Sequence, residues 1–211
     1  MTTTSLSRSL LAWAALSAGL LSPVAAQTTT ARGVAAVVNT AGIQQQLAST
    51  SLPTYGGVNA SSVDLAGIPG VLSASALNTI TSGMLDTPVT SSQTTSELGS
   101  LSVLNGLIRA DQVLAVASSY VNEAGAASNA TGSQLLGLVV AGQSIGSMPA
   151  PNTRINLPGT GYAILNEQIL SGNGVSTSGI TVNMIHVVLT GLFGTKIGEI
   201  ILGSATSAVS R

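Results

Sequence analysis

ITVNMIHVVL, residues 180–189, alternates along the chain with a period of two. Ile180, Val182, Met184 and Val188 fall on one side of this alternation, and His186 falls on the same side. A period of two is typical of a β-strand that buries one face. The segment therefore predicts a strand that packs its apolar side chains into a core.

Other strand-like segments lie before and after this one, separated by turn signals. Asn105-Gly106 stands between two apolar runs and suits the positive-φ positions of a type I′ hairpin turn. No long segment repeats at the helical period, so the pattern predicts an all-β fold. Besides 180–189, the expected strands cover residues 34–38, 41–50, 70–81, 98–104, 107–108, 112–121, 135–145, 162–170 and 197–209, although 41–50 is also compatible with helical turns.

The architecture expected from these strands is an antiparallel β-sandwich, because no crossover helices separate them. A β-solenoid is the alternative, since apolar runs recur beside glycines, but no strict repeat period supports it. Residues 27–95 are expected to form an N-terminal β segment of the same domain, and residues 96–211 the main β-domain. Within the first segment, residues 52–62 are expected to be a loop. Residues 88–97, PVTSSQTTSE, are expected to be a Ser/Thr-rich connector.

The first 26 residues have the features of a cleaved signal peptide. Arg8 provides a positive start, residues 10–21 are apolar and uncharged, and Val24-Ala25-Ala26 offers small residues for cleavage before Gln27. Removing residues 1–26 from the 211-residue chain leaves 185 residues, enough for one domain with a sizeable core. We expect a secreted, extracellular or cell-surface protein, with the periplasm as another destination.

Composition excludes several classes of function. Only 6% of residues are charged, so no basic patch is available for nucleic acid and the surface must consist largely of uncharged polar side chains. The chain has no cysteine, which excludes disulfides and thiolate metal sites. Four aromatic residues follow position 26, which disfavours the stacking platforms of a sugar hydrolase and the girdles of a membrane barrel. We expect no cofactor, no metal and no membrane span after removal of the signal.

His186 is the only histidine and the main candidate for chemistry. A small secreted hydrolase could use it as a general base with Asp111 or Glu167. A packed, hydrogen-bonded histidine is the alternative, and the chain lacks a Gly-x-Ser-x-Gly nucleophile motif. One histidine without cysteine makes a poor metal site.

Lys196 raises a second possibility, because it is the only lysine. Surface adhesins can join a lysine to an asparagine by an isopeptide bond, and Asn166 or Asn183 with Glu167 could serve. An exposed lysine that protects an edge strand is the simpler interpretation. Two segments, beginning at Asn59 and Asn129, match glycosylation acceptors.

Five segments taken in order resemble the bacterial choice-of-anchor P family of exported surface proteins. They are 106–111 (GLIRAD), 151–158 (PNTRINLP), 165–168 (LNEQ), 180–187 (ITVNMIHV) and 199–205 (EIILGSA). The resemblance is stronger after residue 95 than before it. It implies export, a role at the surface or outside the cell, and no enzymatic activity or transferable catalytic residues.

These observations lead to an expected function in the structural class. The chain is predicted to be an exported, non-enzymatic surface or extracellular β-protein of structural or adhesion type. A self-assembling matrix or filament subunit is the alternative within this class, because edge strands with few charges can pair between copies. Its partners would then be other copies of itself or a component of the cell surface or matrix. A hydrolase using His186 and a binding module with an apolar cavity between its sheets are the alternatives from other classes.

Overall fold

The computed structural model describes residues 27–211, whose regular secondary structure is almost entirely β-strand. The predicted signal peptide, residues 1–26, lies outside the described residues. A single 3-10 turn, η1 (Leu192–Gly194), interrupts the strands. No helix in the described part of the chain has the length and apolarity needed to cross a membrane. The strands are β1 (Thr28–Thr40), β2 (Ile43–Ser51), β3 (Gly57–Ile68), β4 (Leu72–Met84), β5 (Thr90–Leu98), β6 (Leu101–Val103), β7 (Ile108–Ala110), β8 (Gln112–Asn122), β9 (Gly125–Asn129), β10 (Gln134–Leu136), β11 (Val139–Val140), β12 (Gln143–Ser144), β13 (Thr153–Leu157), β14 (Gly161–Gly172), β15 (Thr177–Thr190) and β16 (Lys196–Ser210).

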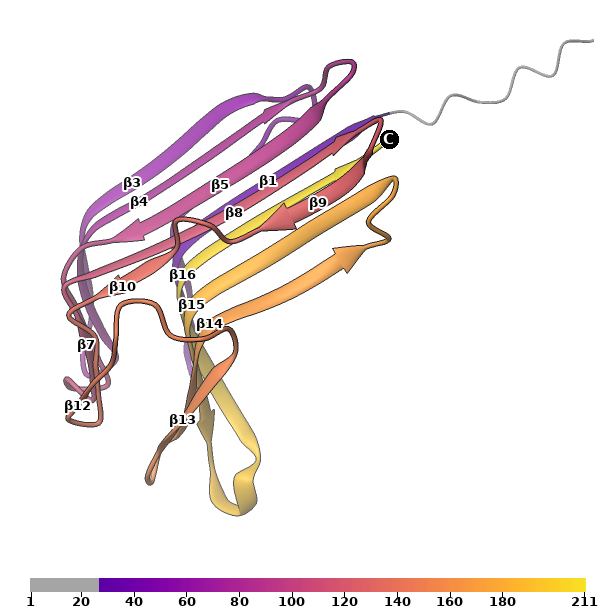
Figure 1. Cartoon of the computed structure of the whole chain (residues 1–211). Coiled ribbons are helices and arrows are strands. Elements are labelled where there is room, and N and C mark those ends of the chain that lie inside the picture. Colours follow the sequence, from indigo (N-terminus) through magenta and orange to yellow (C-terminus); the bar gives the residue numbers. More distant parts are fainter. Residues whose placement is uncertain (1–26) are drawn as a thin grey trace, which may run out of the picture.

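The strands form two antiparallel sheets that face each other (Figure 1). The six-stranded sheet has the order β13-β14-β15-β16-β1-β2. The ten-stranded sheet follows β10-β8-β5-β4-β6-β7-β11-β12, with β3 added on β4 and β9 on β8. The expected sandwich-like fold is confirmed. The solenoid alternative is wrong, because neighbouring strands in the described residues pair antiparallel within two layers.

Strands from both predicted segments mix in both sheets. The six-stranded sheet combines β1 and β2 with β13 to β16, and β5 runs across position 95. The expected connector at 88–97 is wrong over most of its length, because β5 occupies the interior of the ten-stranded sheet. The expected loop at 52–62 is likewise wrong from Gly57 onward, where β3 begins. The expected single strand at 135–145 is divided among β10, β11 and β12.

A row of irregular backbone crosses the six-stranded sheet. On each side of this row, neighbouring strands pair in the same register. Within the row, the residues that face each other on neighbouring strands are not paired, and neither strand has an extra residue there. Its members, in strand order from β14 to β2, are Asn166, Met184, Gly203, Ala35 and Ala48. Three of them, Asn166 (φ 49°), Gly203 (φ 64°) and Ala48 (φ 47°), have left-handed backbone, and they lie on alternate strands. The long strands bend about midway along their length (Figure 1).

This row shifts the alternation of side chains in β15. Met184 and the next residue, Ile185, both point into the core. His186 therefore lies on the opposite face from Ile180, Val182 and Met184, which corrects the expectation that these four residues and Val188 share one side. The cause is the irregular backbone at Met184, which the period-two pattern of the sequence does not reveal.

The interior has two different parts. Around the end of the sandwich that contains the β6–β7 hairpin, large aliphatic side chains such as Leu138, Leu157, Ile185 and Leu202 are fully buried. Around the other end, beside the C-terminal half of β16, the sheets meet through small residues and hydroxyls. The strands there are joined across the sandwich by a hydroxyl cluster, made of Ser92, Thr94, Ser96, Ser119 and Ser207.

The hydroxyl cluster binds one sheet directly to the backbone of the other. Thr94 donates to the carbonyl of Thr206 (2.7 Å), and Ser119 donates to the carbonyl of Ser207 (3.0 Å). Side chains this short reach the opposite backbone only where the sheets approach more closely than the usual spacing of about 10 Å. Gly33 fits the same constraint, because a Cβ there would lie 3.0 Å from the Cβ of Thr79.

Candidate functional site

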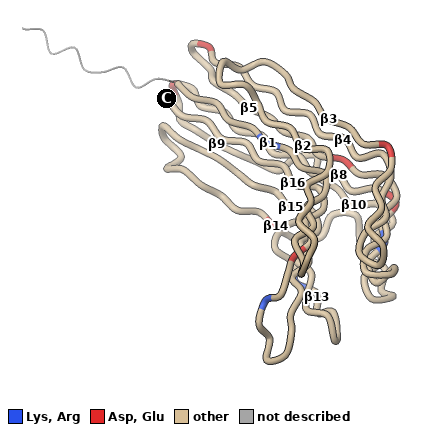
Figure 2. Tube along the Cα trace, turned by 180° about the vertical axis from the view of Figure 1, so that it is seen from behind, with Lys and Arg blue, Asp and Glu red and all other residues tan. Residues whose placement is uncertain are grey.

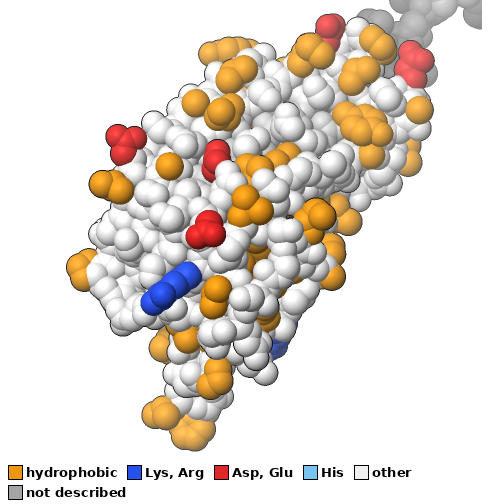
Figure 3. Space-filling model, turned by 60° about the vertical axis from the view of Figure 1, so that its left-hand side comes forward, with side chains coloured by type: hydrophobic (Ala, Val, Ile, Leu, Met, Phe, Trp, Pro, Cys, Tyr) orange, Lys and Arg blue, Asp and Glu red, His pale blue; other side chains and the backbone are white. Residues whose placement is uncertain are grey.

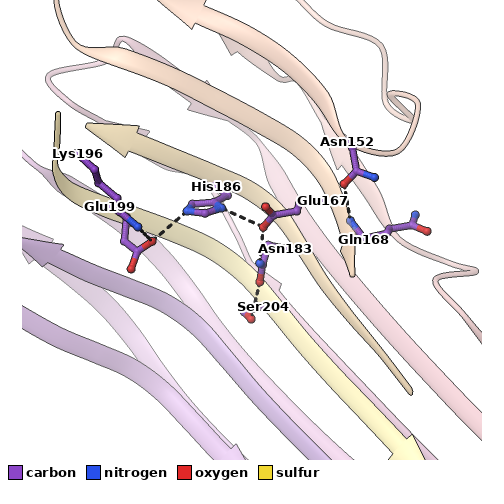
Figure 4. A network of polar contacts seen from close by, with 8 residues as sticks. All are labelled: Asn152, Glu167, Gln168, Asn183, His186, Lys196, Glu199 and Ser204. Atoms are coloured by element: carbon purple, nitrogen blue, oxygen red, sulfur yellow. Dashed lines mark hydrogen bonds and ion pairs between the residues drawn. The ribbon is translucent and has the colours of Figure 1, made fainter. Parts of the chain in front are cut away.

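A polar network crosses β14, β15 and β16 on the face of the six-stranded sheet opposite the core (Figure 4). His186 lies at its centre. Its Nδ1 is 2.9 Å from Oε2 of Glu167, and its Nε2 is 3.1 Å from Oε2 of Glu199. A doubly protonated imidazole can donate to both carboxylates in this geometry.

Both carboxylates have further partners. Glu167 accepts a hydrogen bond from the amide nitrogen of Asn183 (2.7 Å), whose amide oxygen accepts from Ser204 (2.7 Å). Glu199 accepts from Nζ of Lys196 (2.7 Å). The ring of His186 and the two carboxylate side chains are each at most 22% exposed. The network is therefore largely shielded from water, except at Lys196.

The surroundings of Glu199 hold the pKa of its carboxyl below the ordinary value of 4.5. The hydrogen bond from Lys196 is the main cause. Partial burial acts in the opposite direction, and the hydrogen bond to His186 again favours the charged form. Glu199 is thus a stable anion that links the edge of the network to its central histidine.

The contacts of His186 differ from those of the histidine in a catalytic dyad or triad. In a dyad or triad one ring nitrogen contacts an acid while the other faces a nucleophile or substrate. Here both nitrogens contact carboxylates. No hydroxyl among the described residues makes a hydrogen bond to the ring.

Of the two acidic residues predicted to pair with His186, the structure places one beside it. Glu167 is in hydrogen-bonding contact, as the hydrolase hypothesis requires. Asp111 is not, because it follows β7 in the ten-stranded sheet, where its side chain packs over Gly137. Glu199 was missed as a partner, since only the pairing of β15 with β16 brings it near His186.

The residues considered for an isopeptide bond do not lie together. Lys196 contacts Glu199, whereas Asn183 lies on the other side of His186. Asn166 donates to the carbonyl of Pro149 and accepts from Gln168. Lys196 is about half exposed, as the simpler interpretation expects. The strand that it begins, β16, lies between β15 and β1, so the expectation that Lys196 protects an edge strand is wrong.

The acidic residues of the network are not arranged like the ligands of a metal ion. Within residues 27–211, no group of three or more histidine, cysteine, aspartate or glutamate side chains is arranged to hold a metal ion. The two glutamates contact the histidine from opposite sides and so point at its ring nitrogens rather than at a common centre (Figure 4).

Charge is sparse and unevenly divided between the sheets (Figure 2). The ten-stranded sheet and its loops carry five acidic residues and one basic residue, which gives a net charge of −4. The six-stranded sheet carries two acidic and three basic residues, and Arg211 follows its last strand. Its net charge is therefore +2 when His186 is counted as neutral. Arg154 stacks on the ring of Tyr162, 3.8 Å from its centroid. The two sheets, counted with their loops, therefore differ in the sign of their net charge.

Comparison with known proteins identifies no relative. No family model, no curated protein and no solved structure matches the chain. The resemblance to the choice-of-anchor P family therefore stays a prediction from the sequence segments.

Proposed function

We propose that this chain is an exported, non-enzymatic β-protein that acts as a structural or adhesion component at the cell surface or outside the cell. The observation that carries the proposal is the arrangement of His186, whose two ring nitrogens both contact carboxylates. The only histidine is then part of a cross-strand network, and it has no free nitrogen for a substrate. The signal-like sequence before Gln27 supports export.

The composition of the surface agrees with an extracellular structural role. Ser, Thr, Asn, Gln and Gly cover much of the sandwich, and charges are few. The fold is held by backbone pairing and cross-sheet hydroxyl bonds without disulfides. Such a framework does not depend on the redox state of its surroundings.

The test is to express the full chain in a bacterial host with a general secretion system and to analyse the cell and medium fractions. We expect a mature protein that begins at Gln27, identified by its intact mass, outside the inner membrane. The purified protein should show no hydrolysis of ester, glycoside or peptide reporters. Retention with an intact leader in the cytoplasm would contradict the proposal. So would an activity that disappears in His186→Asn.

A self-assembling subunit is a second candidate, and β3 favours it. Among residues 27–211, this twelve-residue strand pairs only with β4, and its other edge has no strand partner. It contains no proline or lysine and one charge, Asp64, whereas soluble proteins usually protect such edges with charges or proline. Val58 and Leu65 are more than 70% exposed on this strand.

A further inference from the structure

The turn between β15 and β16 exposes two large apolar side chains. Leu192 is 83% exposed and Phe193, the only phenylalanine of the chain, is fully exposed. Ile197 follows at 58%. Hydrophobic side chains are visible at this lower tip of the molecule in the space-filling view (Figure 3). We call residues 191–195 the apolar tip.

The backbone of the apolar tip is held by its own hydrogen bonds. The Gly191 amide donates to the Thr195 carbonyl (2.8 Å), and the Thr195 hydroxyl donates to the Leu192 carbonyl (3.1 Å). These polar groups keep their partners when the turn leaves water. Phe193 itself has φ 64° and ψ 17°, a left-handed backbone that bulky residues rarely adopt and that is concentrated at functional positions.

The turns on both sides of the apolar tip are without charge. Residues 40–43 (TAGI) connect β1, which pairs with β16, to β2. Residues 157–161 (LPGTG) connect β13 to β14, and the carbonyl of Thr160 accepts a hydrogen bond from the amide of Thr190 beside the tip (2.9 Å). Figure 2 shows tan, uncharged chain at the lowest turns of this sheet. We call these two turns and the apolar tip the uncharged end.

Charged residues and a tyrosine lie on the sheet just above the uncharged end. Tyr162 and Glu199 lie in one row across the sheet, because both pair with Val188. The Arg154 guanidinium stacks on the Tyr162 ring, 3.8 Å from its centroid, and Lys196 donates to Glu199 (2.7 Å). Tyrosine is enriched at the level of lipid headgroups, and arginine and lysine reach headgroups with their charged ends. We call Arg154, Tyr162, Lys196 and Glu199 the polar belt.

The apolar tip extends past the polar belt by a length that fits the boundary of a lipid bilayer. Phe193 lies five residues after Val188, which belongs to the row of the belt. At about 3.3 Å per residue, the tip protrudes from this row by at most roughly 15 Å. Interfacial segments bury their apolar side chains about 5–10 Å into the boundary between headgroups and acyl chains. An inserted Phe193 would therefore leave the belt at the level of the headgroups.

The size and shape of the apolar tip favour lipid over a protein partner. A stable protein interface uses about 20–30 residues on each side, with surfaces of matching shape. The tip offers two large side chains on a projecting turn, with Gly191 and Gly194 on either side of them. A fluid lipid surface surrounds single side chains without a matching shape.

We propose that the uncharged end rests on a phospholipid surface, with Leu192 and Phe193 inserted and the polar belt among the headgroups. This inference rests on the proposed function and names lipid as its partner at the cell surface. Because only two large side chains insert, the contact is weak and reversible. Glu199 neutralises Lys196, so the contact does not depend on anionic lipid.

The first experiment measures how much of the mature protein, residues 27–211, sediments with phosphatidylcholine vesicles over increasing lipid concentration. Phe193→Asn removes the apolar side chain and keeps a residue type that tolerates positive φ. Tyr55→Asn is the matched control, because Tyr55 is an exposed aromatic residue (82%) at the opposite end of the molecule. Tyr55 lines one surface hollow with Ser92, which contacts Ser207 near the far end of β16 (2.9 Å).

We expect the bound fraction of the unmodified protein and of Tyr55→Asn to rise with lipid and to be insensitive to salt. Phe193→Asn should weaken the partitioning at least about tenfold. Both variants should unfold at the temperature of the unmodified protein within a few degrees, so that a loss of binding reports the contact rather than the fold.

The second experiment uses fluorescence, since the only tryptophan of the chain, Trp13, precedes Gln27. Phe193→Trp gives the mature protein a single reporter in the apolar tip. Its emission should shift to shorter wavelength when phosphatidylcholine vesicles are added, and bromine atoms on the acyl chains should quench it. Tyr55→Trp, at the opposite end, should show neither change.

Three results would overturn the inference. The first is a protein that does not sediment with the vesicles at any lipid concentration, even if secretion at Gln27 leaves the proposed function standing. The second is sedimentation that is equally strong in Phe193→Asn, which would assign the lipid contact to another surface. The third is a mass in light scattering that rises with protein concentration only when Phe193 is present, which would assign the tip to a second copy of the chain.

Discussion

Glu199 connects the exposed and shielded ends of the polar network. It contacts Lys196 on one side and His186 on the other, and both contacts favour its charged form. Because its pKa is lowered by folding, the folded state gains stability above the unfolded value of 4.5 and loses this gain as pH falls through the lower folded value.

Glu199→Gln should therefore destabilise the protein near neutral pH. We expect a loss of about 1 kcal/mol, because the pair is partly exposed to solvent and to salt. The difference from the unmodified protein should shrink as pH falls below 4.5. Urea unfolding at pH 7 and at pH 3 measures it. A difference of equal size at both pH values would show that loss of shape, rather than of charge, causes the effect.

The residue types in the sequence indicated His186 as the centre of this network, but they did not identify all of its members. His186 and Glu167 could be singled out because they are scarce residue types near an apolar strand. Glu199 and Ser204 could not, since they reach the network only through the register of β16 against β15. Asp111 was wrongly considered because nothing in the sequence assigns it to the other sheet.

At the scale of elements, the irregular row across the six-stranded sheet determines which side chains face the core. Most strands were predictable from alternation and turn signals, including 112–121, 162–170 and 197–209. The row could not be predicted from the sequence. Met184 and Ala35 are ordinary strand residues, and they belong to the row because they face Gly203, whose backbone is left-handed. β5 was missed because its buried threonines and serines look like a connector until their cross-sheet acceptors are known.

Gly203 is the position in the row that should tolerate substitution least. Gly203→Ala would put a Cβ at φ 64° and 2.7 Å from Cγ1 of Val113. Left-handed backbone and overpacking together should cost about 3 kcal/mol of unfolding free energy. Chemical denaturation of the mature protein measures the change.

Ala48→Gly in the same row is the matched comparison. Ala48 already has φ 47°, so glycine removes strain while it adds freedom to the unfolded chain. The net change should stay within about 1 kcal/mol. If Gly203→Ala is tolerated as well as Ala48→Gly, the left-handed row is not required for the bend.

At the scale of the whole molecule, the sandwich is stabilised by different interactions at its two ends. The aliphatic end depends on burial, whereas the hydroxyl cluster depends on hydrogen bonds at close approach. Ser207 belongs to the second type, with its Oγ 2.9 Å from that of Ser92 and its own carbonyl accepting from Ser119.

Ser207→Ala should cost about 1–3 kcal/mol, because polar groups of the opposite sheet lose a partner. Ser207→Val should cost more, since its extra methyl groups must fit where the sheets are close. Ser73→Val, at an exposed position on β4, should change stability by at most about 0.5 kcal/mol. Thermal unfolding ranks the three variants. Equal stability of Ser207→Val and Ser207→Ala would argue against close approach of the sheets.

β16, the last strand of the described residues, occupies the middle of the six-stranded sheet, between β15 and β1. Residues near the two ends of the described chain, such as Thr28 and Ser210, are direct neighbours. The six-stranded sheet cannot close until β1 and β16 meet, and contacts between residues so distant in sequence make folding slow. Until β16 is in place, β1 and β15 lack their shared partner, so the six-stranded sheet stays in two separate parts, β1-β2 and β13-β14-β15.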